Sequence, residues 1–91
     1  MEAEVLVYIP PLWLHNRVIV RKKGTRGPEY VLRGLRCGSS REDTTIEIIP
    51  VESCDVRRTE YDSVAVILSV GDVEDNYEST GRTMSITRAP L

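Results

Sequence analysis

The chain has little of what catalysts and metal centres usually carry. Its 91 residues include one histidine and two cysteines. His15 has neither a Gly-x-Ser-x-Gly motif nor a catalytic cysteine signature to act with, and a general base needs such a partner within hydrogen-bond reach. Cys37 and Cys54 do not have the spacing of metal ligands. We therefore expect a protein that is not an enzyme and that holds no metal and no cofactor.

Long hydrophobic runs are also missing. No stretch approaches the roughly 20 apolar residues of a membrane-spanning helix. The apolar run 5–9 is short for a signal peptide, follows two acidic residues and stops at Pro10. Small secreted scaffolds usually carry four or more cysteines. These absences predict a cytoplasmic protein, with the nucleus as the alternative, that has no membrane span. They leave open whether Cys37 and Cys54 are free or joined.

Phenylalanine is absent and alanine is rare, with three residues in the whole chain. There are instead eleven valines, seven isoleucines and seven threonines. β-Branched side chains pack well on a pleated sheet and lose rotamer freedom in a helix. The composition therefore favours a β-sheet with a core of Val, Ile and Leu. A chain of this length is expected to form one β-rich domain, residues 1–91.

Six short segments have the composition or alternation of strands, and no window has a sustained helical period. They are 5–9, 17–22, 29–36, 44–49, 63–70 and 84–87. The run 63–70 is apolar on one face and small or apolar on the other, which predicts a central strand. Pro50 follows the run 44–49, which predicts an edge strand or a bulge there. The polar segment 71–82 is expected to be a loop or a short extension. Together these features predict an all-β fold, a small antiparallel β-barrel or sandwich of about six short strands.

Charge is divided unequally along the chain. Residues 1–41 contain eight Lys or Arg and three acids, a balance of +5, and residues 42–91 contain four Arg and eleven acids, a balance of −7. The sum is the net charge of −2. Three arrangements fit this division: neutralisation within one fold, pairing between copies, or a basic face offered to an acidic partner.

The basic residues gather on an expected hairpin, 17–36. Pairing Val20 with Tyr30 directs four side chains to the core: Val18, Val20, Tyr30 and Leu32. The other face and the loop then present six cations: Arg17, Arg21, Lys22, Lys23, Arg26 and Arg33. Such a surface is a candidate site for phosphates or an acidic partner. It lacks the stacking aromatics of single-strand binders, and a solvated face neutralised by the acidic half explains it equally well.

A second candidate surface is the segment Leu12, Trp13 and Leu14, which follows two prolines. Trp13 can close the end of a small barrel as a plug. It can also be an exposed anchor, because tryptophan is enriched among the residues that dominate protein interfaces. A rigid Pro-Pro segment lowers the entropy cost of presenting such an anchor.

These observations favour a non-catalytic interaction module that binds a protein partner and forms a homodimer. The chain is similar in size and composition to small β-rich accessory proteins of viruses. The alternative function is an RNA- or DNA-binding β-barrel that uses the hairpin 17–36. A third hypothesis is self-assembly in which basic and acidic halves meet between copies. The acidic segment 71–78 is expected to be solvated, because Val73 and Tyr77 interrupt an EF-hand ligand pattern.

Overall fold

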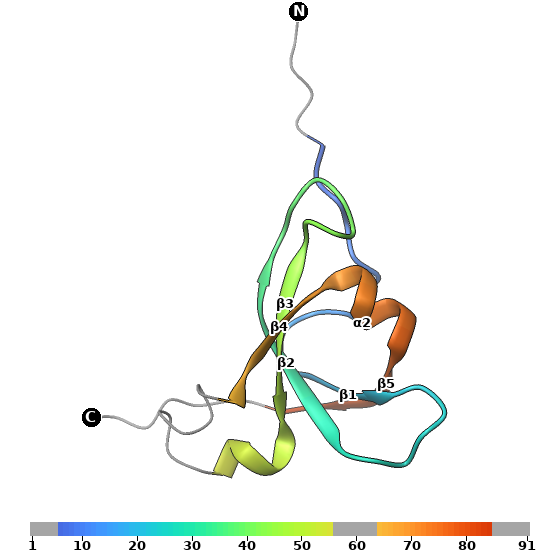
Figure 1. The fold of residues 1–91 in the computed structure, drawn as a ribbon, viewed down its shortest axis with the longest axis vertical. Coiled ribbons are helices and arrows are strands. Elements are labelled where there is room, and N and C mark those ends of the chain that lie inside the picture. The colour runs from blue at the N-terminus through green and yellow to red at the C-terminus, as the bar shows by residue number, and fades with distance from the viewer. Residues whose placement is uncertain (1–5, 56–63, 85–91) are drawn as a thin grey trace, which may run out of the picture.

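The computed structural model describes residues 6–55 and 64–84, which form one antiparallel five-stranded sheet with one short α-helix (Figure 1). The strands are β1 (Val18–Lys22), β2 (Glu29–Arg36), β3 (Thr45–Pro50), β4 (Val66–Ser69) and β5 (Tyr77–Thr83). A 3-10 helix, η1 (Val51–Asp55), follows β3, and the helix α2 (Val70–Asn76) joins β4 to β5. The order across the sheet is β4-β3-β2-β1-β5. The predicted antiparallel β class is therefore confirmed.

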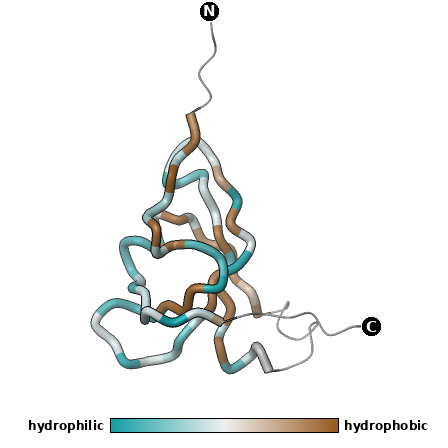
Figure 2. Tube along the Cα trace, turned by 180° about the vertical axis from the view of Figure 1, so that it is seen from behind, coloured by the Kyte–Doolittle hydropathy of each residue, from teal (hydrophilic) through white to brown (hydrophobic). Residues whose placement is uncertain are grey.

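The expected hairpin is present with the predicted register. Val20 pairs with Tyr30, and Arg21 pairs with Glu29. Val18, Val20 and Leu32 are buried in the main core, and Tyr30 packs against it. The loop between β1 and β2 is hydrophilic (Figure 2). Alternation along two strands and a glycine-rich turn were sufficient to define this hairpin, because the contacts that form it are local.

The core has two parts because the sheet is covered on both faces. On one face, Val70 and Val73 of α2 pack with Leu14 and the apolar side chains of β1, β2 and β3. On the other face, Val31 and Ile49 are fully buried, and Val51, Ala65 and Met84 pack against them. The face of the hairpin that the sequence predicted to be either a binding surface or solvated is therefore partly core. Each strand can carry apolar residues at successive positions when both faces are buried.

The segment 71–82, expected to be a loop or a short extension, instead contains most of α2 and of β5. Ser69 begins the helix, because its side-chain oxygen accepts a hydrogen bond from the Asp72 backbone N–H at 3.1 Å. This is the usual role of serine at a helix N-cap. Val70 and Val73 bury one side of the helix. With only seven residues, α2 is too short to show a helical period in the sequence.

Two strands occupy different positions in the sheet from those that the sequence predicted. The run 63–70 was expected to give a central strand, but β4 is the strand at one edge. The run 44–49 was expected at an edge or a bulge, but β3 lies between β2 and β4. Pro50 lies beyond the residues of β3 that pair with β4, so it leaves that ladder intact. A register shift does occur here, on β2, where Gly34 has a φ of 67°.

The first and last expected strands are not present among the described residues. Residues 6–9 have no strand structure, and neither has Met84. Val5 and residues 85–87 lie outside the described residues. Within the described part of the chain β4 and β5 are each paired on one side only, so the sheet does not close into a barrel. The number of strands there is five rather than about six.

Candidate interaction surfaces

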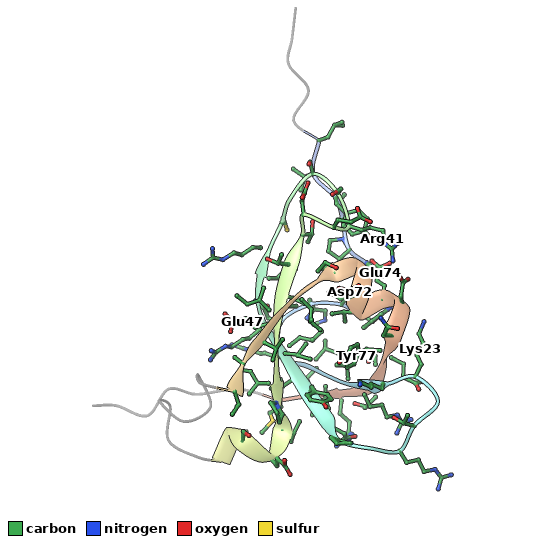
Figure 3. The ribbon with its side chains drawn as sticks, viewed as in Figure 1. Lys23, Arg41, Glu47, Asp72, Glu74 and Tyr77 are labelled. Atoms are coloured by element: carbon green, nitrogen blue, oxygen red, sulfur yellow. The ribbon has the colours of Figure 1, made fainter. Side chains whose placement is uncertain are left out.

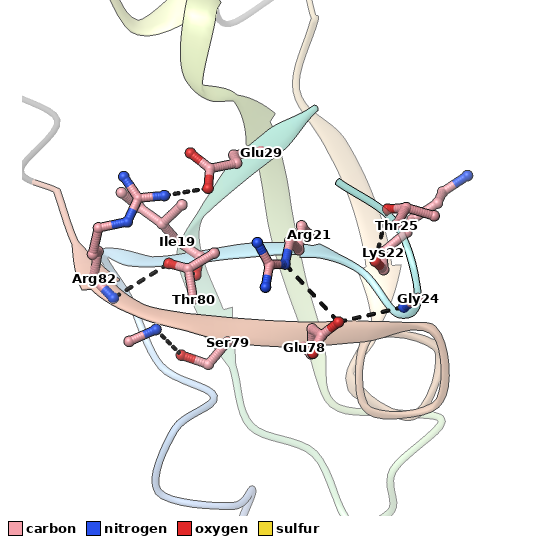
Figure 4. A network of polar contacts seen from close by, with 11 residues as sticks. Ile19, Arg21, Lys22, Gly24, Thr25, Glu29, Glu78, Ser79, Thr80 and Arg82 are labelled. Atoms are coloured by element: carbon pink, nitrogen blue, oxygen red, sulfur yellow. Dashed lines mark hydrogen bonds and ion pairs between the residues drawn. The ribbon is translucent and has the colours of Figure 1, made fainter. Parts of the chain in front are cut away.

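Two arginines of the predicted basic face, Arg21 and Arg33, are paired with acidic residues of the same chain. Arg33 Nε donates to Glu47 Oε2 at 2.8 Å, and Glu47 projects from β3 at the side of the sheet (Figure 3). Arg21 Nε lies 3.9 Å from Glu78 Oε1 on β5 (Figure 4). Both acids belong to the acidic half of the sequence. Neutralisation within the fold, one of the three arrangements considered, therefore accounts for these two arginines.

A further ion pair joins β5 and β2, and here the basic residue comes from the acidic half of the sequence and the acidic residue from the basic half. Arg82, from β5 in the acidic half, pairs with Glu29 at the start of β2 (Figure 4). On β5, Thr80 Oγ1 donates to the carbonyl oxygen of Ile19 on β1 at 2.9 Å. The surface over β1, β2 and β5 is therefore a mixed, internally bonded layer rather than a uniformly positive one.

Four cations of the predicted site form no ion pair within the described residues: Arg17, Lys22, Lys23 and Arg26. Lys22 and Lys23 line an open hollow of about 500 Å³ beside α2. Asp72 and Asp75 line the same hollow. These carboxylates oppose the binding of a phosphate there, since like charges repel at short range. This hollow is therefore poorly suited to hold an anion.

A second charged cluster holds the N-terminal arm, residues 6–12, against α2. Arg41 Nη2 donates to Asp75 Oδ1 at 2.9 Å, and Arg41 Nε lies 3.4 Å from Glu74 Oε2 (Figure 3). The Tyr8 hydroxyl donates to the other oxygen of Glu74. The Tyr8 backbone N–H donates to the Gly38 carbonyl oxygen at 2.9 Å. Sequence reasoning did not single out Arg41, because its partners are about 30 residues away and no local pattern indicates them.

Two tyrosines have a raised pKa, and the stability of the fold should therefore fall at high pH. The hydrogen bond to Glu74 is the main cause for Tyr8, and burial is the main cause for Tyr77. Both causes favour the neutral phenol in the folded state. Their stabilisation is complete below the ordinary pKa of 10.0 and is lost as the pH rises through the folded-state pKa. We expect the melting temperature to be lower at pH 11 than at pH 9.

The variant Tyr8→Phe isolates the part of this loss that depends on Tyr8. Phenylalanine has no hydroxyl group to ionise, so only the natural chain loses the contribution of Tyr8 as the pH rises. The difference in melting temperature between the natural chain and the variant should therefore shrink from pH 9 to pH 11. All other residues are the same in both proteins, so their contributions cancel from the comparison. A difference that stays constant with pH would contradict the role assigned to the Tyr8–Glu74 hydrogen bond.

The predicted Trp13 surface is divided by the fold. Leu14 is 1% exposed and belongs to the main core. Trp13 is half-buried and packs against that core, as a plug would. Leu12 is 94% exposed and lies on the N-terminal arm with the exposed side chains of Leu6, Val7 and Ile9. Of the three predicted residues, only Leu12 is fully open to a partner.

A further exposed apolar surface lies on β4 and just before it, where the sequence predicted a central strand. Val64, Val66 and Ile67 are 41%, 51% and 66% exposed. Natural proteins usually protect an edge strand with charges, proline or a bulge. The strand β5, at the other edge, contains Glu78 and Arg82 and has a register shift against β1. The strand β4 has none of these features along Val66–Ser69.

No protein-family model, curated protein or solved structure matches this chain. The functional argument therefore depends on the surfaces themselves. Among the described residues no group of His, Cys, Asp and Glu could hold a metal ion, and no helix could cross a membrane. Cys37 is a free, exposed thiol, and the Cys54 side chain lies outside what the structure describes. His15 Nδ1 lies 3.0 Å from the Asn16 carbonyl oxygen on the surface.

Proposed function

We propose that this protein is a non-catalytic interaction module that binds proteins and associates with itself, acting in the cytoplasm or the nucleus. The observation that carries the proposal is the apolar, unprotected edge at β4. Among the residues that the structure describes, Ile67 and Val66 are exposed on a strand that has a partner on one side only.

An exposed apolar edge strand can bind another strand through its main chain and its side chains. Its outward N–H and C=O groups can bond to another strand, and its apolar side chains lose water contact when one is added. The three exposed residues are all β-branched, which suits cross-strand packing. A soluble domain that leaves such a strand open gains stability when the edge is covered.

The charges support protein binding over nucleic-acid binding. Arg21 and Arg33 are engaged by Glu78 and Glu47, so they would have to exchange these partners for phosphates. RNA or DNA binding by the hairpin 17–36 would depend mainly on four cations, two of which line a hollow with carboxylates. The pairing of Arg21 and Arg33 within the chain also removes two charges from an assembly in which basic and acidic halves of different copies meet.

Sedimentation equilibrium of the whole chain tests this proposal. We expect a reversible dimer at high micromolar concentration. Its dissociation constant should change little between about 0.05 and 0.5 M salt, because apolar and main-chain contacts are screened weakly. A monomer throughout this range would contradict self-association. A dimer that dissociates steeply with salt would indicate charge pairing between copies instead.

A further inference from the structure

We infer that the β4 strands of two copies pair antiparallel, with Ile67 of one copy opposite Ile67 of the other, to give one continuous sheet. This inference rests on the proposed self-association and names its surface. The two-fold axis would run perpendicular to the sheet through the Ile67 pair. Three observations support this geometry: the direction of the main-chain groups, the faces of the side chains, and the charges beside them.

The main-chain groups of Ile67 point away from the rest of the sheet. The Val70 N–H donates to the Thr44 carbonyl oxygen at 2.7 Å, which is the next pair after Thr45 and Ser69 in the β3–β4 register. In an antiparallel ladder, successive residues direct their N–H and C=O groups to opposite sides. The groups of Leu68 therefore point toward β3, and those of Ile67 and Ser69 point outward. An incoming strand would bond to the outward groups.

The two faces of the sheet restrict the register. A two-fold axis perpendicular to the sheet keeps the α2 face of both copies on the same side. Residues directly opposite in an antiparallel pair also share a side. The axis must therefore pass between one residue and the same residue of the second copy, which lie directly opposite each other. With Ile67 at the centre, Val66 lies opposite Leu68, and Ala65 lies opposite Ser69, so every pair is apolar or small.

Among the described residues, the charged neighbour of Ile67 in the sheet is already neutralised. Ile67 pairs with Glu47 on the neighbouring strand β3, and Glu47 pairs with Arg33 on β2, so the three side chains form one row across the same face of the sheet. The 2.8 Å hydrogen bond between these two compensates the carboxylate nearest to Ile67. In the dimer the central Ile67 pair would have an Arg33–Glu47 ion pair on each side, one from each copy. Two like strands can therefore approach without the repulsion that a charged edge imposes.

The contact is short, and this sets its strength. Pairing of one edge strand of four residues buries much less than the 1,200–2,000 Å² of a standard stable interface. We therefore expect a micromolar rather than a nanomolar dimer. This agrees with the concentration range chosen for sedimentation.

Disulfide trapping tests the pairing residue by residue. The background is Cys37→Ser with Cys54→Ser, which removes both natural thiols. The variant Ile67→Cys should form a reducible covalent dimer under mild oxidation, because hydrogen-bonded antiparallel pairs have Cα atoms about 5.5 Å apart, within the range for a disulfide. Val66→Cys is the matched control. In the proposed register the two Val66 positions are offset by two residues, at about 8 Å, which is too far.

Leu12→Cys is the second control, because Leu12 is the most exposed apolar side chain of the described residues and lies on the N-terminal arm. Faster trapping of Val66→Cys than of Ile67→Cys would overturn the Ile67-centred register. Preferential trapping of Leu12→Cys, or a dimer that none of the three variants traps, would overturn pairing through β4 and leave self-association intact. A chain that is monomeric and is not trapped would overturn the proposed function as well.

The substitution Ile67→Lys gives an independent measurement without oxidation. Since Ile67 is 66% exposed, the fold should persist, with an unchanged circular dichroism spectrum. The dimer should be lost at concentrations where the natural chain is dimeric, because two ammonium groups would meet at the axis. A folded Ile67→Lys protein that still forms the dimer would contradict the inference.

Discussion

Replacing Ile46 with alanine should lower the free energy of unfolding by about 2–5 kcal/mol. Ile46 is fully buried in the main core, on β3, between β2 and β4. The substitution removes three carbon atoms and leaves a cavity that surrounding strands cannot readily fill. A domain of this size has a total stability of about 5–14 kcal/mol, so a loss of about 5 kcal/mol would leave the chain partly unfolded where the total lies at the lower end of that range. Urea unfolding followed by circular dichroism measures the loss.

The matched control is Ile9→Ala, the same chemical change at a side chain that is 83% exposed. We expect its effect to be within about 0.5 kcal/mol. Similar losses in the two variants would show that Ile46 is not part of a packed core. They would therefore contradict the strand order in which β3 is an interior strand.

The second large effect is expected at Gly38, in the loop between β2 and β3. An added Cβ would lie 2.6 Å from the Asp43 carbonyl oxygen, a main-chain atom that cannot rotate away. The same glycine donates its N–H to Thr44 Oγ1 at 3.0 Å and accepts from the Tyr8 N–H. Gly38→Ala should therefore shift this loop and cost about 1–3 kcal/mol of stability, the usual range for overpacking.

Gly27→Ala is the control for this prediction, since neither glycine has a positive φ. Its added Cβ would have Thr25 Oγ1 as its nearest neighbour, at 3.8 Å, which is ordinary contact. We expect its stability to be unchanged or slightly increased, because alanine restricts the unfolded chain. An equal loss in both variants would assign the effect to backbone flexibility rather than to the close approach of Asp43.

The local parts of this fold were predictable. The hairpin of β1 and β2, including the Val20–Tyr30 pair, followed from alternation and from a turn with two glycines and a proline. Its partners are separated by few residues, so the sequence around them contains most of the information. The helix α2 was missed for the opposite reason. Its stability comes from packing Val70 and Val73 on the sheet, and its short sequence reads as polar.

The candidate sites were predicted less well than the fold. The six cations were correctly placed on one hairpin, but their partners were not foreseen. Glu78 reaches Arg21 only because β5 returns to pair with β1, 57 positions along the chain. Leu12 and Leu14 are chemically identical neighbours, yet one is exposed and the other is core. The sequence of the segment 10–14 does not distinguish them. Which leucine is buried depends on how the segment packs against the main core, which residues far along the chain form.

The sequence by itself determined the β class, the hairpin register and the residues available for a Val, Ile and Leu core, because these depend on side-chain shape and on neighbours close in the chain. Only the tertiary structure decided which strand lies at the edge. The run 63–70 is more apolar than 44–49, and on composition it belongs inside. Instead β3 takes the interior position, since it pairs with both β2 and β4. The apolar side chains of β4 therefore remain exposed, and the surface proposed here for self-association exists for that reason.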